Sequence, residues 1–401
     1  MKRRKSTGCL GKLIFWIFVL IVLGAALFYY LRPDQLDELI AKYQSKIGTQ
    51  SDMEKNTIPP EKLAGDFYYN QLSEEEKTVY KEILQGLWQF SSEIQVHSID
   101  AEAAGNVFRK ILYDNPDIFW CDGSATSTTY SDYTIFVPNY TCSQEEKTVR
   151  QAQIDASVEE CLSKIPADES TYHKIQYIYE YLVNQTDYQL DCADSQNIYS
   201  VFVNKVSVCA GYAKATQLLL QKSGIECIYV TGSTVDTGQS HAWNLVKIDE
   251  NYYHVDTTWG DPVFVMQEEN IENALNISYD YLCCSDEEAA KTHVWDQGIG
   301  LPACTSKAYN YYILNHCYYE NFDSEEVLKA MNDTIYSGGG QTIFKFANDE
   351  VYYQAKDSIL GDLASRAMQN LMSVYGLDSV SCGQMVDDGA NKIIIYWNYG
   401  T

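Results

Sequence analysis

The sequence predicts an α+β protein whose central part is one helix packed on an antiparallel sheet. The helix is expected over residues 210–222, with leucines at 218–220 on its buried side. Gly224 follows it, where a left-handed C-cap belongs. Three strand-like runs come next, at residues 225–231, 241–248 and 252–258. A polar turn at 249–251 separates the last two runs, so we expect those strands to pair.

Length and composition indicate a chain of two or three folded domains. The chain has 401 residues, of which 46% are hydrophobic, and this excludes a fully disordered protein. Acidic residues outnumber basic ones by 55 to 29, which gives a formal net charge of −26. Nucleic acid is excluded as a partner, because a phosphate backbone is bound by clustered Lys and Arg. The 33 tyrosines suit half-buried surfaces but indicate no function.

The N-terminal residues predict a membrane anchor followed by a stalk. Residues 1–12 are a basic tail, and residues 13–31 then run without a charge. A helix over 13–31 spans about 28 Å, close to the thickness of a bilayer's hydrocarbon core. The basic flank predicts a cytoplasmic N-terminus and an extracytoplasmic remainder of a single-pass protein of the cell membrane. The polar residues 32–64 are expected to form the stalk.

A cleaved signal peptide is the alternative to this anchor. Gly24-Ala25-Ala26 offers a cleavage site of small residues. The apolar run continues past that site to Leu31, which favours an uncleaved anchor. Cys9 precedes the apolar run, so a lipoprotein cysteine is not indicated.

Residues 65–165 predict a mostly helical region. Two capping boxes, in which glutamate follows serine by three residues, start helices at Ser73 and Ser143. Asp100 caps another helix, and residues 114–117 stop it. The expected helices end near residues 87, 113 and 165, and strands are expected at 118–121 and 133–137.

Residues 166–305 are expected to form the central domain, and residues 306–401 a small α/β module. The central domain gains two more helices, at 169–184 and 197–203. The module is expected to contain a helix from residue 324, a strand at 342–346, a long helix at 350–375, and strands at 379–385 and 392–397.

Cys209 lies where a loop becomes a helix, in the sequence SVCAGYA. The backbone N–H groups and the positive end of the helix dipole favour a thiolate there. Gly211 keeps the first turn narrow, so that another part of the chain can approach. Taken alone, a small apolar cysteine at a helix start is more often a packing residue.

His241 and Asp256 supply the two further groups that a nucleophilic cysteine needs. The imidazole of His241, at the start of a strand, is a base suited to neutral pH. Asp256 is expected in the middle of the next strand, directly opposite His241, where it could orient the ring. The alternative is a core cysteine, a surface histidine and an aspartate near a turn. The three residues together favour catalysis.

Two other histidines have weaker signals. His254 is two residues from Asp256 on the same expected strand, so both point to one face as polar neighbours. His293 is expected in a loop, with a structural hydrogen bond rather than a metal. No Cys/His cluster has zinc spacing and no EF-hand pattern is present, so we predict neither a metal site nor a cofactor. A calcium site on the acidic surface is the alternative.

Four motifs between Thr171 and Pro302 carry a resemblance to a known family: VCAGYA, QLLLQKSGIECIYVTG, HAWNLVKI and YYHVDTTWGDP. They resemble the transglutaminase-like superfamily of papain-fold cysteine enzymes, in its bacterial, membrane-anchored branch. The upstream segments DFYYNQLSEEEKTVY and DNPDIFW resemble the region that often precedes this core. The resemblance implies a papain-like fold, with Cys209 as nucleophile, His241 as general base and acid, and Asp256 as orienting residue.

The resemblance also implies acyl transfer through a thioester, on a peptide or protein substrate. Water would complete a peptidase or amidase reaction, on substrates that include cell-wall peptides. An amine would complete protein cross-linking, which is the second possibility for an enzyme. The alternative of a different class is a cell-surface binding or scaffold module without turnover.

Four residues near the motifs are assigned further roles. Tyr199 or Asn204, upstream of the cysteine, could donate a hydrogen bond to the oxyanion beside the Cys209 N–H. Trp243 and Trp259 could wall the substrate groove. The alternative for the aromatic residues is core packing, and for Asn204 it is a loop cap.

The remaining cysteines leave two possibilities open. The chain has 12 cysteines, and ten remain outside the membrane when Cys9 and Cys209 are set aside. These ten could form up to five disulfides. Cys121 with Cys142, and Cys304 with Cys317, are close enough in sequence to clip a loop. Free buried thiols are the alternative.

Overall fold

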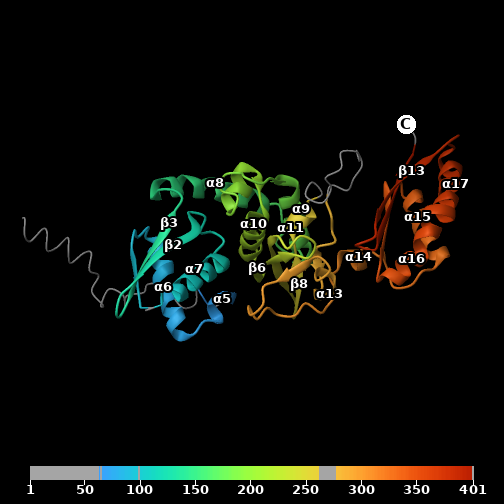
Figure 1. The fold of residues 1–401 in the computed structure, drawn as a ribbon. Helices are drawn as coiled ribbons and strands as arrows, with labels where there is room; N and C mark the ends of the chain where they lie inside the picture. The colour runs from blue at the N-terminus through green and yellow to red at the C-terminus, as the bar shows by residue number, and fades with distance from the viewer. Residues whose placement is uncertain (1–62, 64–65, 98–99, 262–276, 400–401) are drawn as a thin grey trace, which may run out of the picture. The chain divides into compact units, whose positions relative to one another are not determined.

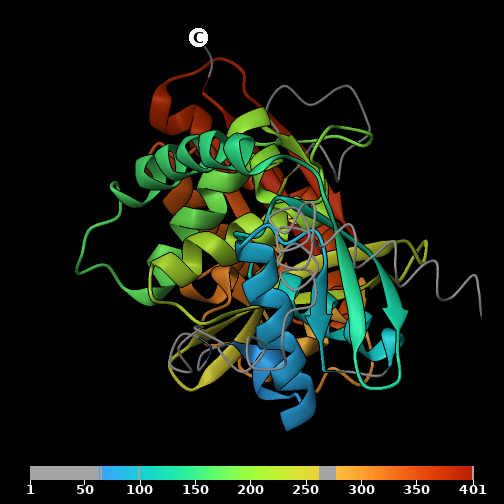
Figure 2. The same ribbon diagram turned by 90° about the vertical axis from the view of Figure 1, so that its left-hand side faces the viewer.

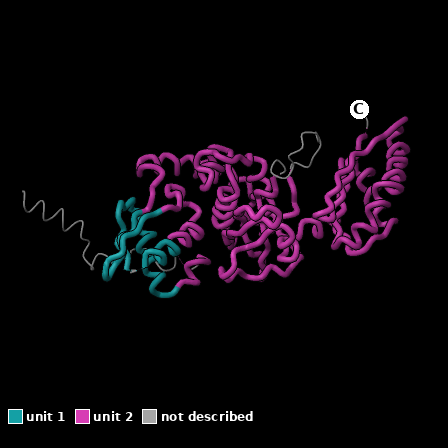
Figure 3. The backbone as a smooth tube through the Cα atoms, viewed as in Figure 1, with its two compact units in different colours: residues 1–62, 73–107, 125–137 teal, residues 63–72, 108–124, 138–401 magenta. Residues whose placement is uncertain are grey.

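The computed structural model describes residues 63, 66–97, 100–261 and 277–399 (Figure 1). Its backbone divides into two compact units, drawn in teal and magenta in Figure 3. The described part of the first unit lies within Ser73–Val107 and Ala125–Val137, and the second comprises Leu63–Leu72, Phe108–Ser124 and Pro138–Thr401. The domain boundaries expected from the sequence stay predictions.

The predicted anchor, residues 13–31, lies outside the described residues, as does nearly all of the stalk. Both stay predictions. Among the residues that the structure describes, none of the helices combines the length and the apolar character needed to cross a bilayer.

The first unit is built on helix α6 (Glu74–Trp88) and strand β1 (Ile94–Val96). The predicted capping box starts α6: Ser73 Oγ accepts from the Glu76 N–H, and the Glu76 carboxylate accepts from the Ser73 N–H. The strand belongs to a three-stranded sheet in the order β1-β3-β2, in which β2 is Cys121–Thr129 and β3 is Thr134–Tyr140. These two are the long teal arrows in Figure 2.

Helix α7 (Ala101–Asp114) begins at the predicted cap, where Asp100 Oδ1 accepts from the N–H groups of Glu102 and Ala103. The strand predicted at 118–121 starts only at Cys121, the first residue of β2, because residues 118–120 form an irregular buried segment. The Ile118 and Phe119 N–H groups bond to the carbonyls of Asn115 and Asp117 instead of to a neighbouring strand. The apolar side chains of residues 118–120 are buried, but they do not form a strand.

The second unit contains a five-stranded sheet with the helices α8 (Gln144–Leu162), α9 (Thr171–Gln185) and α10 (Cys209–Lys222). The strands lie in the order β10 (His293–Trp295), β6 (Cys227–Thr234), β7 (Ser240–Ile248), β8 (Asn251–Val255) and β9 (Leu282–Cys284). Their pairings are antiparallel. Helix α10 packs on β7 and β6, as the sequence predicts, and α9 packs on α10.

Short elements connect these parts. They are α5 (Phe67–Asn70), β4 (Asp187–Tyr188), β5 (Val206–Ser207), α11 (Thr257–Gly260), α13 (Asp286–Ala289) and α14 (Tyr311–Leu314). The helix predicted at 197–203 is a π-helical turn at Ser200–Asn204, which Lys205 ends with a φ of 62°. Strands β4 and β5 pair in parallel just ahead of α10.

The strand predicted at 252–258 is too long, and its predicted register is wrong. Strand β8 ends at Val255, because Asp256 leaves the sheet and caps α11. Asn244 pairs with Val255, so the strands are offset by two residues from the pairing of His241 with Asp256. The two side chains meet beyond the end of β8 instead of across it.

The C-terminal part of the second unit confirms the predicted order of helices and strands. Its sheet has the order β11 (Tyr318–Tyr319), β12 (Gln341–Phe346), β14 (Lys392–Asn398) and β13 (Ser381–Asp387). Helix α15 (Ser324–Tyr336) precedes β12. The predicted long helix consists of α16 (Asp349–Ser358), a π-helical turn at Ile359–Leu363 and α17 (Ala364–Tyr375).

The eleven cysteines that the structure describes are free thiols. Neither Cys121 with Cys142 nor Cys304 with Cys317 is bonded. Most of these thiols are buried, and Cys192, Cys209, Cys317 and Cys382 are partly exposed.

A buried ion cluster joins the segment before β9 to the C-terminal sheet. Asp280 Oδ1 lies 2.7 Å from Lys345 Nζ of β12, and Asp280 also pairs with Lys392 of β14. The side chains are 9%, 12% and 5% exposed, so solvent screens them little. Burial raises the pKa of Asp280, but the two lysines overcome this and hold it well below its usual value.

Replacing Asp280 with alanine is expected to lower the free energy of unfolding by about 3 kcal/mol, because two buried lysines lose their counter-ion. Chemical denaturation measures this directly. Asp333→Ala is the matched control, since its pair with Lys329 is exposed and is worth at most about 1 kcal/mol. Equal losses for the two variants would contradict the structural role of Asp280.

Candidate active site

Cys209 is the first residue of α10 and is partly exposed. Val208 precedes it in an extended conformation and caps the helix without a side-chain hydrogen bond. The chain reaches this point through β5, which pairs with β4. The side chain of Cys209 therefore lies at the N-terminal, positive end of the helix dipole.

The sequence predicts that Gly211 lets another part of the chain come close, and in the structure the residues around Ser195 and Ser207 do so. A Cβ at this position would lie 2.0 Å from Ser207 Oγ and 2.9 Å from the Ser195 carbonyl oxygen. Ser207 Oγ in turn contacts Ser200 Oγ at 2.7 Å and bonds to the Ser195 carbonyl at 3.1 Å. These contacts fix the loop that carries Cys209.

His241 links the thiol to a carboxylate. It lies near the start of β7, and its ring is 3% exposed. Nε2 lies 2.6 Å from Asp256 Oδ2, and Cys209 lies near enough to act with Asp256 in raising the pKa of the ring. An ionised carboxylate can only accept, so Nε2 carries a proton and Nδ1 is left for the thiol.

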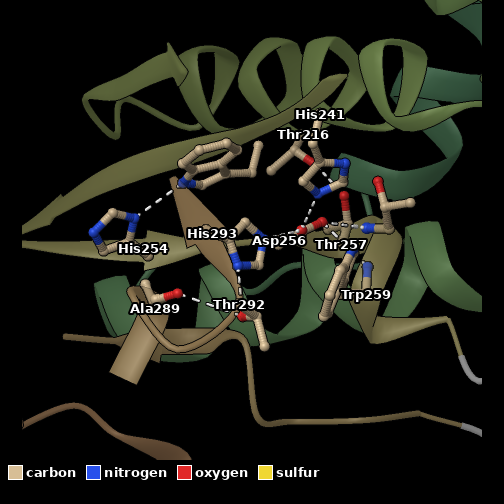
Figure 4. Close-up of polar contacts among 11 residues, drawn as sticks. Thr216, His241, His254, Asp256, Thr257, Trp259, Ala289, Thr292 and His293 are labelled. Atoms are coloured by element: carbon tan, nitrogen blue, oxygen red, sulfur yellow. Dashed lines mark hydrogen bonds and ion pairs between the residues drawn. The ribbon is translucent and has the colours of Figure 1, made fainter. Parts of the chain in front are cut away.

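Asp256 is held by four donors (Figure 4). As N-cap of α11, its Oδ1 accepts from the N–H of Thr258 at 2.8 Å and of Trp259 at 3.2 Å. Its Oδ2 accepts from Nε2 of His241 and, at 3.0 Å, from Nε2 of His293. Burial raises the pKa of this carboxyl, but the two imidazoles overcome burial and lower it. Asp256 is therefore ionised at neutral pH.

His293 is a site residue that sequence reasoning missed. It lies on strand β10 rather than in a loop, and its side chain is 2% exposed. Pairing with Thr234 of β6 brings the ring to the carboxylate. The three-residue strand is too short to give a periodic signal, so the sequence offered only a histidine beside a tryptophan.

An imidazole hydrogen-bonded to a buried carboxylate thus lies near a thiol at a helix N-terminus. Residues 160–257, which contain all three, match the model of the transglutaminase-like superfamily. The match is to this segment and not to the chain as a whole.

The similarities to individual proteins are partial. Kyphoscoliosis peptidase of Mus musculus is 22% identical over 131 residues, a match that covers 29% of this chain and 20% of that protein. The crystal structure of a TGase is similar with a TM-score of 0.26 and 15% identity, over 38% of this chain and 47% of that one. The structure of a candidate cysteine protease of Cytophaga hutchinsonii is similar with a TM-score of 0.24 and 14% identity. The match covers 34% of this chain and 61% of that one.

The two predicted groove residues, Trp243 and Trp259, differ in their surroundings. Trp243 is 1% exposed and stacks on His241, with 5.8 Å between the ring centroids. It lies in the core, so a role in walling an open groove is wrong for Trp243. Trp259 is partly buried and lines a cavity of about 570 Å³. Tyr281 and Thr292 line the same cavity.

His254 contacts Trp243 rather than the candidate nucleophile. The Trp243 Nε1–H donates to His254 Nδ1 at 3.0 Å, since an indole nitrogen can only donate. His254 Nε2 must then carry the ring proton, which it donates to Asp286 Oδ1 at 2.8 Å. This network fixes the indole on which His241 stacks.

The two predicted oxyanion donors have other partners. The Tyr199 hydroxyl donates to Gln153 at 2.9 Å, and the Asn204 amide donates to the Ala193 carbonyl at 3.3 Å. The structure therefore gives no support to an oxyanion role for either. Tyr188, at the end of β4, is a tyrosine near the site: burial, and then the charges of Cys209 and Asp256, raise its pKa to about 12. A phenol that stays protonated remains a hydrogen-bond donor.

Two groups of three side chains have ligand atoms close enough to hold a metal. In the described residues, these are His241 with Asp256 and His293, and His254 with Asp286 and Cys304. Within each group the atoms lie within 4.8 Å of one another. The imidazole Nε2 atoms face carboxylates as donors, so a cation would have to displace those protons. We assign no metal to either group.

The charge state of His241 predicts a pH-dependent stability. Burial lowers the pKa of His241, but Asp256 and then Cys209 overcome this and raise it from 6.5 to about 10. A raised folded-state pKa stabilises the fold fully below pH 6.5, and the contribution disappears as the pH rises through about 10.

The free energy of unfolding of the wild type should therefore exceed that of His241→Gln most at pH 6 and below, by at least about 1 kcal/mol. The difference should shrink between pH 6.5 and 10. Urea denaturation of both proteins at a series of pH values measures it. A difference that is constant over this interval would contradict an imidazolium at His241.

Proposed function

We propose that this chain is a cysteine-dependent acyl-transfer enzyme, a peptidase or amidase of the transglutaminase-like type. The observation that carries the proposal is the hydrogen bond from His241 to the buried Asp256, close enough to Cys209 for that cysteine to raise the pKa of the ring. The match of residues 160–257 to the transglutaminase-like superfamily supports the same chemistry. The substrate is a peptide or protein, with cell-wall peptides among the options.

The reaction begins with attack of the Cys209 thiolate on an amide carbonyl. The imidazolium of His241 pairs with the thiolate before attack and then protonates the departing amine. Asp256 keeps the ring oriented and stabilises its positive charge. The Cys209 N–H, at the start of α10, is one donor to the oxyanion. Water, activated by the neutral His241, then hydrolyses the thioester and restores the thiol.

The proposal includes an extracytoplasmic site of action. Residues 13–31 act as the membrane anchor, and the basic residues ahead of them keep the N-terminus in the cytoplasm. Fractionation of cells that express the full chain tests this. Protein in the membrane fraction that added protease digests from outside supports it, and protein in the soluble fraction contradicts it.

The activity is tested with a mixture of labelled peptides and a labelled primary amine. Release of acid products by the wild type, and none by Cys209→Ala, supports a peptidase or amidase. Incorporation of the amine in place of acid release indicates protein cross-linking, which shares the same thioester. Neither product, together with an unreactive Cys209, indicates a binding or scaffold module.

A further inference from the structure

Two histidines contact the same oxygen of Asp256. His293 Nε2 lies 3.0 Å from Oδ2, and His241 Nε2 lies 2.6 Å from that same atom (Figure 4). The three side chains are at most 3% exposed. Each hydrogen bond is therefore made without competition from bulk water, which strengthens it. Cysteine-based acyl transfer as proposed above assigns His241 and Asp256 roles, but it does not use His293.

The neighbours of His293 leave its Nε2 as a donor. Thr292 Oγ1 lies 2.8 Å from Nδ1 and 3.4 Å from the Ala289 carbonyl oxygen. With a neutral ring, the Thr292 hydroxyl donates to Nδ1. With a charged ring, Nδ1 donates to Thr292, whose hydroxyl then donates to Ala289. In both cases Nε2 keeps its proton and donates it to Asp256.

Aromatic rings hold His293 in place. Its ring centroid lies 4.8 Å from Trp243, 4.9 Å from Trp259 and 5.3 Å from Tyr281. Pairing of β10 with β6 fixes its backbone. These contacts and the backbone pairing favour the ring orientation in which the donor is aimed at the carboxylate.

We propose that His293 is a positioning residue, whose Nε2–H holds the Asp256 carboxylate in the orientation that receives His241. This inference rests on the proposed function. Without that donor, Oδ2 keeps His241 as its single partner, and the carboxylate is held less firmly in the plane that receives the ring. Formation of the reactive thiolate–imidazolium pair then becomes slower or less complete, although His293 touches neither thiol nor substrate.

Alkylation of Cys209 by iodoacetamide, followed by peptide mass spectrometry, tests this without knowledge of the substrate. At pH 6.5 the wild type should react at least about 10-fold faster than His241→Ala. His293→Leu should react about 5-fold more slowly than the wild type, because it lacks one hydrogen-bond donor. His293→Gln should react within about 2-fold of the wild type, because its amide N–H can replace Nε2.

A full profile from pH 5 to 9 separates positioning from packing. The ionisable groups that face His293 are His241 on β7, Asp256 before α11, Tyr281 before β9 and His254 on β8. The loss in His293→Leu should be largest at the acid end, where the thiolate depends most on the imidazolium. A uniform loss at every pH would indicate packing alone and overturn the proposal.

The remaining outcomes are distinguishable. Equal rates for the wild type and His241→Ala would remove the proposed function itself. If Cys209 is alkylated slowly in His241→Ala but as fast as in the wild type in His293→Leu, only the proposed role of His293 is contradicted. A His293→Gln as slow as His293→Leu would also contradict only that role. If His293→Leu does not fold by circular dichroism, His293→Phe replaces it, because it keeps a ring but has no donor, and a rate equal to the wild type would then overturn the proposal.

Discussion

Replacing Cys209 with alanine is expected to remove the amide-bond activity, by a factor of at least about 10³, without unfolding the protein. The sulfur is the proposed nucleophile, and no other group at the start of α10 can replace it. The side chain is small and partly exposed, so its loss should change the free energy of unfolding by less than about 1 kcal/mol. Product release and thermal unfolding, measured on the same preparation, test both parts.

Cys192→Ala is the matched control for this variant. Cys192 is also a partly exposed free thiol, and it contacts the Gln189 and Val206 carbonyls of the loop ahead of α10. It should keep full activity. Wild-type rates from Cys209→Ala on a validated substrate would contradict the proposed mechanism.

The change of Asp256 to asparagine is expected to slow acylation by about 10³–10⁴-fold. The amide has one oxygen where the carboxylate has two. If that oxygen keeps the bonds to the Thr258 and Trp259 N–H groups, the amide NH₂ faces His241. His241 must then present Nε2 as an acceptor and carry its proton on Nδ1, where it can no longer accept one from Cys209.

The opposite orientation of the amide restores the acceptor for His241 but points an NH₂ group at the α11 N–H groups. That loses the N-cap, which is worth about 1 kcal/mol. Either way one function of Asp256 is lost. Rates of acylation and thermal unfolding are compared with those of Asp236→Asn, an exposed aspartate between β6 and β7. Acylation by Asp256→Asn within 10-fold of the wild type would contradict the orienting role.

Local signals in the sequence were sufficient for much of the fold. The capping boxes at Ser73 and Ser143 start helices in the structure as predicted. Helix α10 and the strands after it occur in the predicted order. The position of Cys209 at the start of α10 followed from the same local reasoning, because it depends only on where a helix begins.

The sequence could not predict which side chains surround Asp256. The pairing of β7 with β8 is offset by two residues from the prediction, because a strand pattern does not fix where Asp256 leaves the sheet to cap α11. His293 reaches the same carboxylate only because β10 pairs with β6, a non-local contact that no periodicity encodes. The oxyanion role predicted for Tyr199 also depends on non-local contacts, because its ring packs against Phe119 and Arg150.

The relative reactivity of the partly exposed thiols at pH 6 tests the proposed activation of Cys209 most directly. One alkylation experiment on the intact protein, resolved by peptide mass spectrometry, compares Cys209 with Cys192, Cys317 and Cys382. We expect Cys209 to react at least about 10-fold faster than the other three, and to lose this advantage in His241→Ala. If Cys209 reacts no faster than the other three, the sulfur is not activated by His241 and the proposed chemistry is wrong.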